Sequence, residues 1–471
     1  MIKYIFIAIV LFIFSGDAFS QQGDSLRNPP VDSLHPDDKT MKLYIEQIVI
    51  VGNDVTEPEI ITREMITREK SYTDVETLNE DLQRIYNLRL FNRVDIMPYP
   101  ASAEGYNLII TVEETFYILP IPIGGFKEGD WNKFWAGLNL KWRNFRGRNE
   151  TLGLSFGVFY EPFINASYSI PWIGKKSHFF ADYDIGYSVN NNKSILSSSE
   201  QSLGLNTDAI RTYKLYDFKT QLTFGKYLTK DLSNSMGFGY NSITTSDYQP
   251  GRTLSTDGND KYLSYRYNIN YDTRDSYEYT LAGAQIEFEY KKYGFGDIIN
   301  YNSGTLDIRK FIPIKLSPTY FISLGTRINS TIFWGGNIAD YHHQFFGYGK
   351  IIRGWNDYVL EGENSFSVFN ELRIPVVKPF FLPGKEIPIV KKLPIVKDIS
   401  YRLGLYFTLF CDVGGTWNKY DRIGDTRFIN GYGAGLNFIL PFGFIGRTDW
   451  AFRHQNDYFK GQLIVSLSSS F

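Results

Sequence analysis

From residue 116 to the C-terminus, apolar and polar side chains alternate in short segments that are separated by polar turns. The clearest segment runs from Tyr265 to Asp272, with apolar residues at odd positions and polar residues at even positions. Because neighbouring side chains of a strand point to opposite faces, this period of two predicts strands with one apolar and one polar face. Sixteen candidate strands can be counted, near residues 116–125, 133–142, 150–160, 163–172, 177–189, 211–226, 233–244, 261–272, 283–292, 300–313, 319–333, 364–376, 401–417, 430–440, 443–453 and 460–471.

The connections between these strands differ in length in a regular way. Long polar connections, as at 190–207 and 244–260, follow every second strand, and the intervening turns are mostly shorter. An even number of strands with long loops at one end is typical of a transmembrane β-barrel. A soluble β-sandwich would also alternate, so the turn lengths carry the argument for a barrel.

The chain before residue 116 has a different pattern, and we divide it into three parts. Residues 1–20 combine a basic start, an apolar run and small residues, which predicts a secretory signal peptide. Residues 21–40 are polar and contain several prolines, which is typical of a flexible linker. Residues 41–115 show strand patterns at 43–51, 91–97 and 107–112 and helical spacing at 57–66 and 74–88, with Thr73 and Asp74 as candidate N-caps.

Composition agrees with a barrel that occupies residues 116–471. Aromatic residues make up 17% of the chain, including 34 Tyr and 37 Phe, and aromatic girdles at two membrane interfaces would use them. After the signal peptide no stretch approaches ~18 consecutive apolar residues, so a membrane crossing would have to be made by strands. The net charge of −2 gives no reason to expect nucleic-acid binding, and the single Cys411 excludes an internal disulfide.

One basic side chain in a loop and two acidic side chains on strands are the candidates for a polar site. Arg353 lies in the polar and aromatic stretch 348–355, between two strand patterns. Alternation puts Glu371 and Asp412 on the polar faces of the two strands that follow. A guanidinium matches paired carboxylates better than an ammonium group does, so a loop folded into the barrel could present Arg353 to both. The alternative is a solvated arginine in a surface loop.

Short motifs in these places are similar to those of a known family. Ile352-Arg353-Gly354-Trp355 resembles the [VI]-R-G-[FYW] loop signature of the POTRA-barrel outer-membrane proteins, which include BamA, TamA and the two-partner secretion transporters. The run from Phe410 through Asp412 to Gly414 resembles their F-x-D-x-G strand signature. Ile48 to Asn53 and Leu90 to Val94 resemble parts of a single POTRA domain.

This resemblance implies an α+β POTRA domain in the periplasm, followed by an all-β, 16-stranded transmembrane β-barrel in the outer membrane of a Gram-negative cell. It implies that Arg353, Gly354, Glu371, Asp412 and Gly414 hold the loop inside the lumen. The POTRA domain would offer an open sheet edge to extended polypeptide, or it would only position the barrel.

The first and last strands suggest a weak lateral seam. Pro120 and Pro122 are two residues apart and remove two backbone donors from the same edge of the first strand. If that edge faces the last strand, the seam would involve Pro120, Pro122, Gly124, Gly125 and Gly461. The alternative is that the prolines face the second strand, and the sequence leaves both open. Phe471 resembles the C-terminal aromatic signal by which outer-membrane barrels are recognised for insertion.

Enzyme signals are weak, and we expect no catalytic residue, metal or cofactor. Gly153 to Gly157 matches G-x-S-x-G but lies inside a predicted strand, whereas a nucleophile elbow needs a strand, a turn and a helix. The resemblance instead implies a factor that inserts or exports client proteins. Its partners would be outer-membrane lipid, unfolded or exported clients and other assembly subunits. The alternatives are an accessory or structural barrel subunit and a passive pore. The connection 376–399 nearly repeats an apolar and basic motif, as expected of a membrane-surface segment or of a plain insertion.

Overall fold

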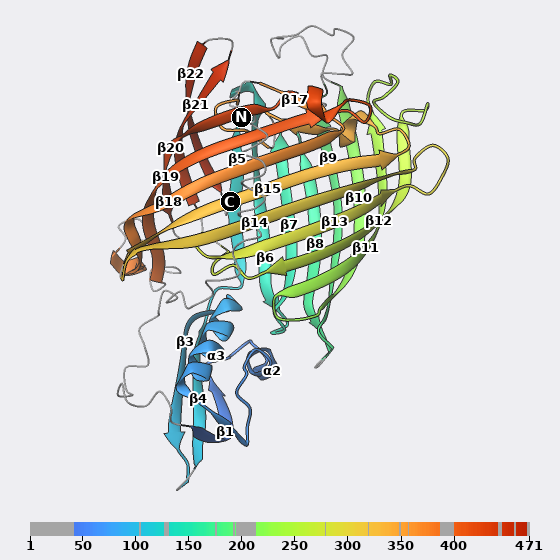
Figure 1. Ribbon diagram of the computed structural model, residues 1–471. Coiled ribbons are helices and arrows are strands. Elements are labelled where there is room, and N and C mark those ends of the chain that lie inside the picture. Colours follow the sequence, from blue (N-terminus) through green and yellow to red (C-terminus); the bar gives the residue numbers. More distant parts are fainter. Residues whose placement is uncertain are drawn as a thin grey trace.

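The computed structural model describes residues 42–468 except 103–104, 127–130, 175–176, 192–193, 195–212, 278, 319, 348–349, 357, 387–399, 441–444 and 456–457. The predicted signal peptide, the predicted linker, Phe471 and most of the 376–399 connection lie outside the described residues. Two parts of the chain follow one another, a small N-terminal domain and a large curled sheet above it (Figure 1).

The N-terminal domain is a four-stranded sheet with two helices. Its elements are β1 (Leu43–Val51), α2 (Pro58–Thr62), β2 (Ser71–Thr73), α3 (Val75–Asn87), β3 (Phe91–Pro100) and β4 (Gly105–Glu114). The sheet order is β2-β1-β4-β3, with β1 and β4 parallel. Helix α3 begins where predicted, because the side chain of Asp74 accepts a hydrogen bond from Thr77 N.

Helix α2 is shorter than the predicted 57–66. The backbone N–H groups of Ile66 and Thr67 donate to the carboxylate of Asp81 on α3 rather than to helical carbonyls. Asp81 is fully buried, so this local arrangement ends α2 and joins the two helices in the core.

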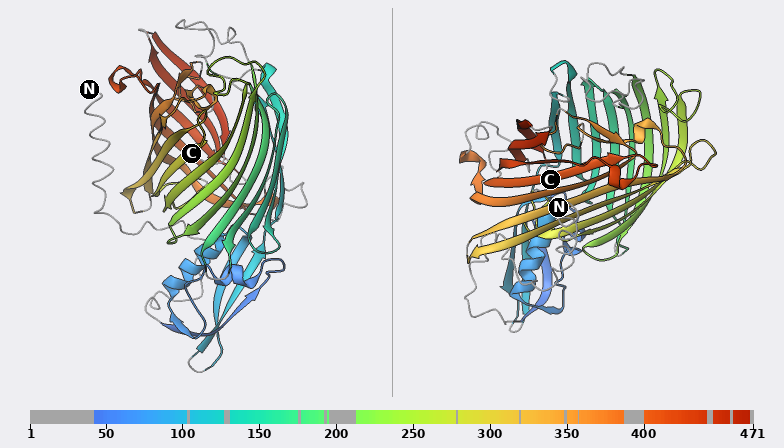
Figure 2. Two further views of the ribbon diagram at one scale, coloured as in Figure 1. Left: turned by 90° about the vertical axis from the view of Figure 1, so that its right-hand side faces the viewer. Right: turned by 45° about the horizontal axis from the view of Figure 1, so that its top comes forward.

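Sixteen strands form the second part, as predicted. They are β5 (Ile118–Phe126), β6 (Phe134–Phe145), β7 (Glu150–Phe159), β8 (Phe163–Ile173), β9 (Phe179–Asn191), β10 (Lys214–Tyr227), β11 (Leu232–Thr245), β12 (Asn259–Asp272), β13 (Gly283–Tyr293), β14 (Tyr301–Ser317), β15 (Tyr320–Gly335), β18 (Asn364–Pro383), β19 (Ser400–Trp417), β20 (Ile429–Ile439), β21 (Ile445–Gln455) and β22 (Tyr458–Ser468). Each pairs with its neighbour in sequence, and the sheet curls into a barrel (Figures 1 and 2). The predicted fold class is confirmed.

The two faces of the barrel wall differ in polarity, as alternation predicts. Large apolar side chains are exposed on the outside, among them Leu263 (61%), Trp450 (61%) and Val465 (72%). Charged side chains such as Asp307 and Arg373 are buried on the inside. Among the described residues no helix is both long and apolar enough to cross a membrane.

The two ends of the barrel wall are the outer edges of β5 and β22. The sheet order begins at β22 and ends at β5, and within the described residues no ladder pairs these two strands. The seam region therefore consists of two strand edges.

The N-terminal domain contacts the turn between β6 and β7 of the barrel. Glu57 N donates to Gly147 O at 2.9 Å, and the Glu57 carboxylate forms an ion pair with Arg148 at 2.9 Å. Asn144 Nδ2 donates to Thr56 Oγ1, also at 2.9 Å. The turn between β6 and β7 therefore faces the domain, and the connections between β9 and β10 and between β15 and β18 lie at the opposite end (Figure 1).

Candidate functional site

The connection between β15 and β18 folds back into the barrel. It contains η5 (Asp340–His342), β16 (Gln344–Phe346) and β17 (Leu360–Gly362). Within it, residues 350–356 form what we call the lumen loop, where Ile352 and Trp355 are buried in a cluster with Phe346 and Ile429. A Cβ added to Gly414 on β19 would lie 2.7 Å from Ile352 Cδ1, so a glycine allows the loop to approach the wall.

Arg353 carries the main polar contacts of the lumen loop. Its Nε and Nη2 donate to the two oxygens of Asp412 on β19, at 2.6 and 2.8 Å. Its Nη1 donates to Glu371 Oε2 on β18 at 3.1 Å and lies 3.5 Å from Asp449 Oδ2 on β21. The guanidinium also stacks 3.7 Å from the ring centroid of Phe410. The structure thus brings together Arg353, Glu371 and Asp412, which the sequence placed near one another.

The charged cluster is larger than the sequence indicated. Glu371 Oε1 accepts a hydrogen bond from Arg373 Nε at 2.9 Å and another from Asn437 Nδ2 at 3.3 Å. Arg373 could have been found, because it stands two residues after Glu371 and therefore on the same strand face. Asn437 and Asp449 are on β20 and β21, and only the pairing of the strands brings them to this position.

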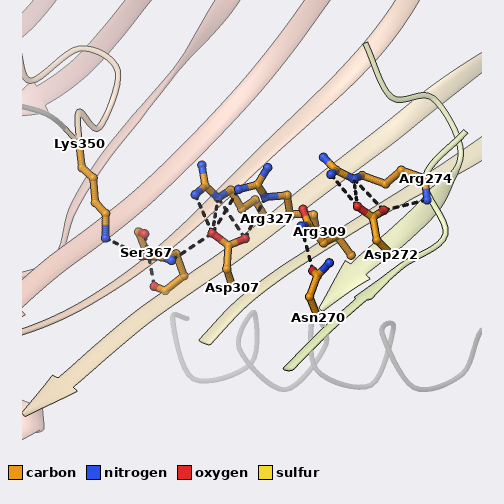
Figure 3. Close-up of polar contacts among 10 residues, drawn as sticks. Asn270, Asp272, Arg274, Asp307, Arg309, Arg327, Lys350 and Ser367 are labelled. Carbon is orange, nitrogen blue, oxygen red and sulfur yellow. Dashed lines mark hydrogen bonds and ion pairs between the residues drawn. The ribbon is translucent and has the colours of Figure 1, made fainter. Parts of the chain in front are cut away.

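Lys350 attaches the start of the lumen loop to another part of the wall. Its Nζ donates to Asn329 Oδ1 on β15 at 2.7 Å, and Asn329 Nδ2 donates to Asp307 on β14. Asp307 in turn pairs with Arg327 at 2.6 Å and with Arg309 at 2.9 Å. Figure 3 shows this row of contacts, which sequence reasoning did not single out.

The other end of the lumen loop contacts the last strands. Trp355 Nε1 donates to Asn430 O at 2.6 Å, and Arg453 Nη1 on β21 donates to Gly354 O at 2.9 Å. Gly354 has φ +92°, a left-handed conformation that glycine adopts without strain. Asn356 N donates to Gln462 Oε1 on β22 at 3.3 Å. The loop therefore reaches across the inner wall from β15 to β22.

The prolines of β5 face away from β6. Tyr117 O accepts a hydrogen bond from Arg143 N at 2.7 Å, and the register continues this ladder through Ile121 opposite Asn139. In an antiparallel pair the hydrogen-bonding residues alternate, so Pro120 and Pro122 direct their missing donors to the open edge. Of the two possibilities that the sequence left, the geometry matches the one in which that edge faces the seam.

The predicted seam glycines have separate surroundings. A Cβ at Gly124 would lie 2.9 Å from Trp135 O on β6, and one at Gly461 would lie 3.1 Å from the ring of Phe452 on β21. Both glycines therefore fit their strands closely against the neighbours with which they already pair. Gly125 also lies on β5, opposite Trp135.

Comparisons with known proteins agree with this fold. A family model described as the Omp85 superfamily domain matches residues 144–382, more than half of the chain, and a POTRA model described as surface antigen variable number repeat matches residues 43–115.

Among solved structures, BamA from Haemophilus ducreyi lacking POTRA domains 1–3 is similar, with a TM-score of 0.55, 16% identity and coverage of 90% of this chain and 83% of that chain. CdiB from Escherichia coli has a TM-score of 0.59, 14% identity and coverage of 90% and 75%. CdiB from Acinetobacter baumannii has a TM-score of 0.57, 12% identity and coverage of 90% and 73%. At these identities the structures support the fold alone.

Proposed function

The chain belongs to the Omp85 superfamily, and from this premise we propose that it inserts client proteins into the outer membrane through the seam between β5 and β22. The superfamily consists of transport and insertion factors, and the single POTRA domain would lie in the periplasm. In this proposal the lumen loop acts as a lock, and clients and outer-membrane lipid are the partners.

The observation that carries the proposal is the pair of open strand edges. An open edge at membrane depth is costly, because backbone donors and acceptors find no water there. Pro120 and Pro122 lower the number of donors on the β5 edge, so a ladder formed between β5 and β22 would be weak. The last strand has no proline between Tyr458 and Ser468 and keeps every donor. An incoming client strand would therefore pair best with β22.

The lumen loop is well placed to control this seam. It contacts β20, β21 and β22 through Trp355, Gly354 and Asn356, and Arg353 fixes it to β18 and β19. With the loop in place, the last three strands are held to the rest of the wall. Withdrawal of Arg353 would free them to move.

A second candidate function is export of one client through the lumen. It is favoured by a polar patch on the inner wall of β8 to β13, which is lined by hydroxyl, amide and carboxylate side chains such as Ser167, Asp182, Asn268 and Gln285. Such a surface would contact an extended chain without holding it by apolar burial. An accessory barrel subunit or a passive pore would need neither feature.

Depletion of the protein followed by proteomics of outer membranes separates these functions. Loss of many barrel proteins supports insertion, and loss of one exported protein supports export. Unchanged levels of both classes would contradict the proposal and favour an accessory barrel or a pore. Complementation with the wild-type chain is the control, and a variant with a disulfide across the seam tests whether insertion needs the seam to open.

A further inference from the structure

The connection between β12 and β13 enters the barrel from the POTRA side. We call residues 273–282, without 278, the inner turn. Tyr279, Thr280 and Leu281 are 2%, 5% and 3% exposed, and Tyr279 and Leu281 pack in one apolar cluster with Tyr406 and Ile445 of the wall. Turns at this end of a barrel ordinarily lie in water, whereas these three residues are buried inside the wall.

The inner turn touches the same charged cluster as the lumen loop. Arg373 Nη1 donates to Thr280 O, and the Arg373 guanidinium stacks 4.4 Å from the ring of Tyr279. Asn437 Nδ2 donates to Tyr279 OH at 3.0 Å. Arg373 and Asn437 also donate to Glu371 Oε1, while Arg353 binds the other oxygen.

Tyr277, in the exposed part of the inner turn, contacts the POTRA domain. The guanidinium of Arg89, just after α3, lies 5.3 Å from the ring centroid of Tyr277. Tyr277 is 51% exposed, and Arg274 stacks on the same ring at 5.1 Å while it pairs with Asp272 at 2.7 Å. A tyrosine ring within about 6 Å of two guanidinium groups makes favourable cation–π contacts with both.

We propose that the inner turn is a second closure of the lumen, which transmits displacement of the POTRA domain to the lumen loop. Tyr279 and Thr280 act as positioning residues, because they hold Arg373 and Asn437 where both can bind Glu371. If the POTRA domain moves when it binds a client, Tyr277 loses its cation–π contact with Arg89, and the inner turn is held less firmly against the wall. Glu371 then loses its support, and Arg353 loses one of its carboxylate partners.

This coupling must act in both directions, because a coupling free energy between two sites is reciprocal. Release of the lumen loop should therefore loosen the inner turn by a comparable factor. A purely structural role of Tyr279 does not require this second effect.

The test measures the position of the lumen loop by thiol labelling. A single cysteine is introduced by Ile352→Cys, at a fully buried position of the lumen loop, into a Cys411→Ser chain, and its reaction with a membrane-impermeant maleimide is timed in the full-length protein. Tyr277→Ala and Tyr279→Phe are expected to raise the labelling rate several-fold. Tyr271→Ala, which removes a 40% exposed tyrosine from the outer face of β12, is the matched control and should leave the rate unchanged.

The reciprocal measurement is hydrogen exchange of residues 273–282 in Arg353→Ala, where we expect faster exchange than in the wild type. Wild-type labelling rates in both tyrosine variants, or unchanged exchange in Arg353→Ala, would overturn the proposal. Tyr277 is exposed, so its variant supplies the labelling result even if Tyr279→Phe fails to fold. The inference rests on the proposed function, because the POTRA domain is taken to move when it binds a client. The labelling rate reports the position of the lumen loop whether or not a client is inserted.

Discussion

At the scale of single residues, the Arg353 cluster shows why a buried charge needs several partners. A guanidinium taken out of water is stable only when its donors are satisfied in good geometry. Here Asp412 binds two of its donors, Glu371 binds a third, and Phe410 covers one face. Removal of either carboxylate would leave part of the Arg353 guanidinium buried without a hydrogen-bond acceptor.

Arg353→Lys tests whether geometry or charge holds the lumen loop. Lysine keeps the charge but cannot form the bidentate contact with Asp412, so we expect a loss of about 3 kcal/mol in stability of the locked barrel. The temperature at which the folded form disappears from semi-native gels measures this loss. Arg422→Lys, at an exposed loop position, should behave as wild type. Equal melting of all three proteins would show that charge alone is sufficient.

A second residue prediction concerns pH at the outer end of the barrel. Burial raises the pKa of Asp340 to about 6, with Glu361 adding to the effect and His343 opposing it. Because the folded-state pKa lies above the unfolded value, this carboxyl favours the folded loop at low pH, and that contribution is lost as pH rises through about 6. Asp340→Asn should therefore slow hydrogen exchange of residues 336–363 relative to wild type at pH 8. Near pH 4 the two proteins should match, and a difference of equal size at both pH values would contradict this account.

At the scale of elements, strands were predictable and their connections were not. All sixteen barrel strands follow from the period of two, because each wall face meets one environment along its whole length. The inner turn has no such period. Tyr279 and Leu281 are buried because the turn packs against Tyr406 and Ile445 of the wall, and this packing cannot be read from the sequence of the turn. In the same way Glu371 and Asp412 could be assigned from alternation, whereas Asp449 needed the strand register.

The prolines of β5 give the prediction at this scale. Pro120→Ala with Pro122→Ala restores two backbone donors to the open edge, so pairing of β5 with β22 should become stronger by about 1 to 3 kcal/mol. We expect a higher melting temperature and a lower ability to complement depletion. Pro313→Ala, in β14 away from the seam, is the control. Full complementation by a more stable double variant would show that weak pairing at the seam is not needed for function.

At the scale of the whole molecule, the POTRA domain and the barrel are joined by close contacts. Gly147 has φ +72°, and a Cβ there would lie 2.1 Å from Val55 O. The turn between β6 and β7 thus leaves space for the POTRA backbone only because no side chain is present.

Gly147→Ala should displace the POTRA domain from the barrel. Alanine in the left-handed region costs about 1–2 kcal/mol, and the close approach to Val55 adds to this cost. Gly174→Ala is a matched control, since Gly174 has φ +73° but a Cβ there would meet only Ser177 Oγ at 3.4 Å. Faster proteolysis between Glu114 and Ile118 in Gly147→Ala alone is the expected result. The same rate in both variants would show that backbone strain, and not POTRA contact, is responsible.

The charged cluster of the lumen loop also affects how ions would pass through the barrel. The loop supplies Arg353 as a cation, whereas Glu371, Asp412 and Asp449 belong to strands that stay in the wall. When the loop leaves, Arg373 stays beside Glu371 in the wall, but all three carboxylates lose the Arg353 guanidinium. The lumen then carries one positive charge fewer, so the reversal potential measured across a planar bilayer under a potassium chloride gradient should shift toward the potassium value when the loop leaves.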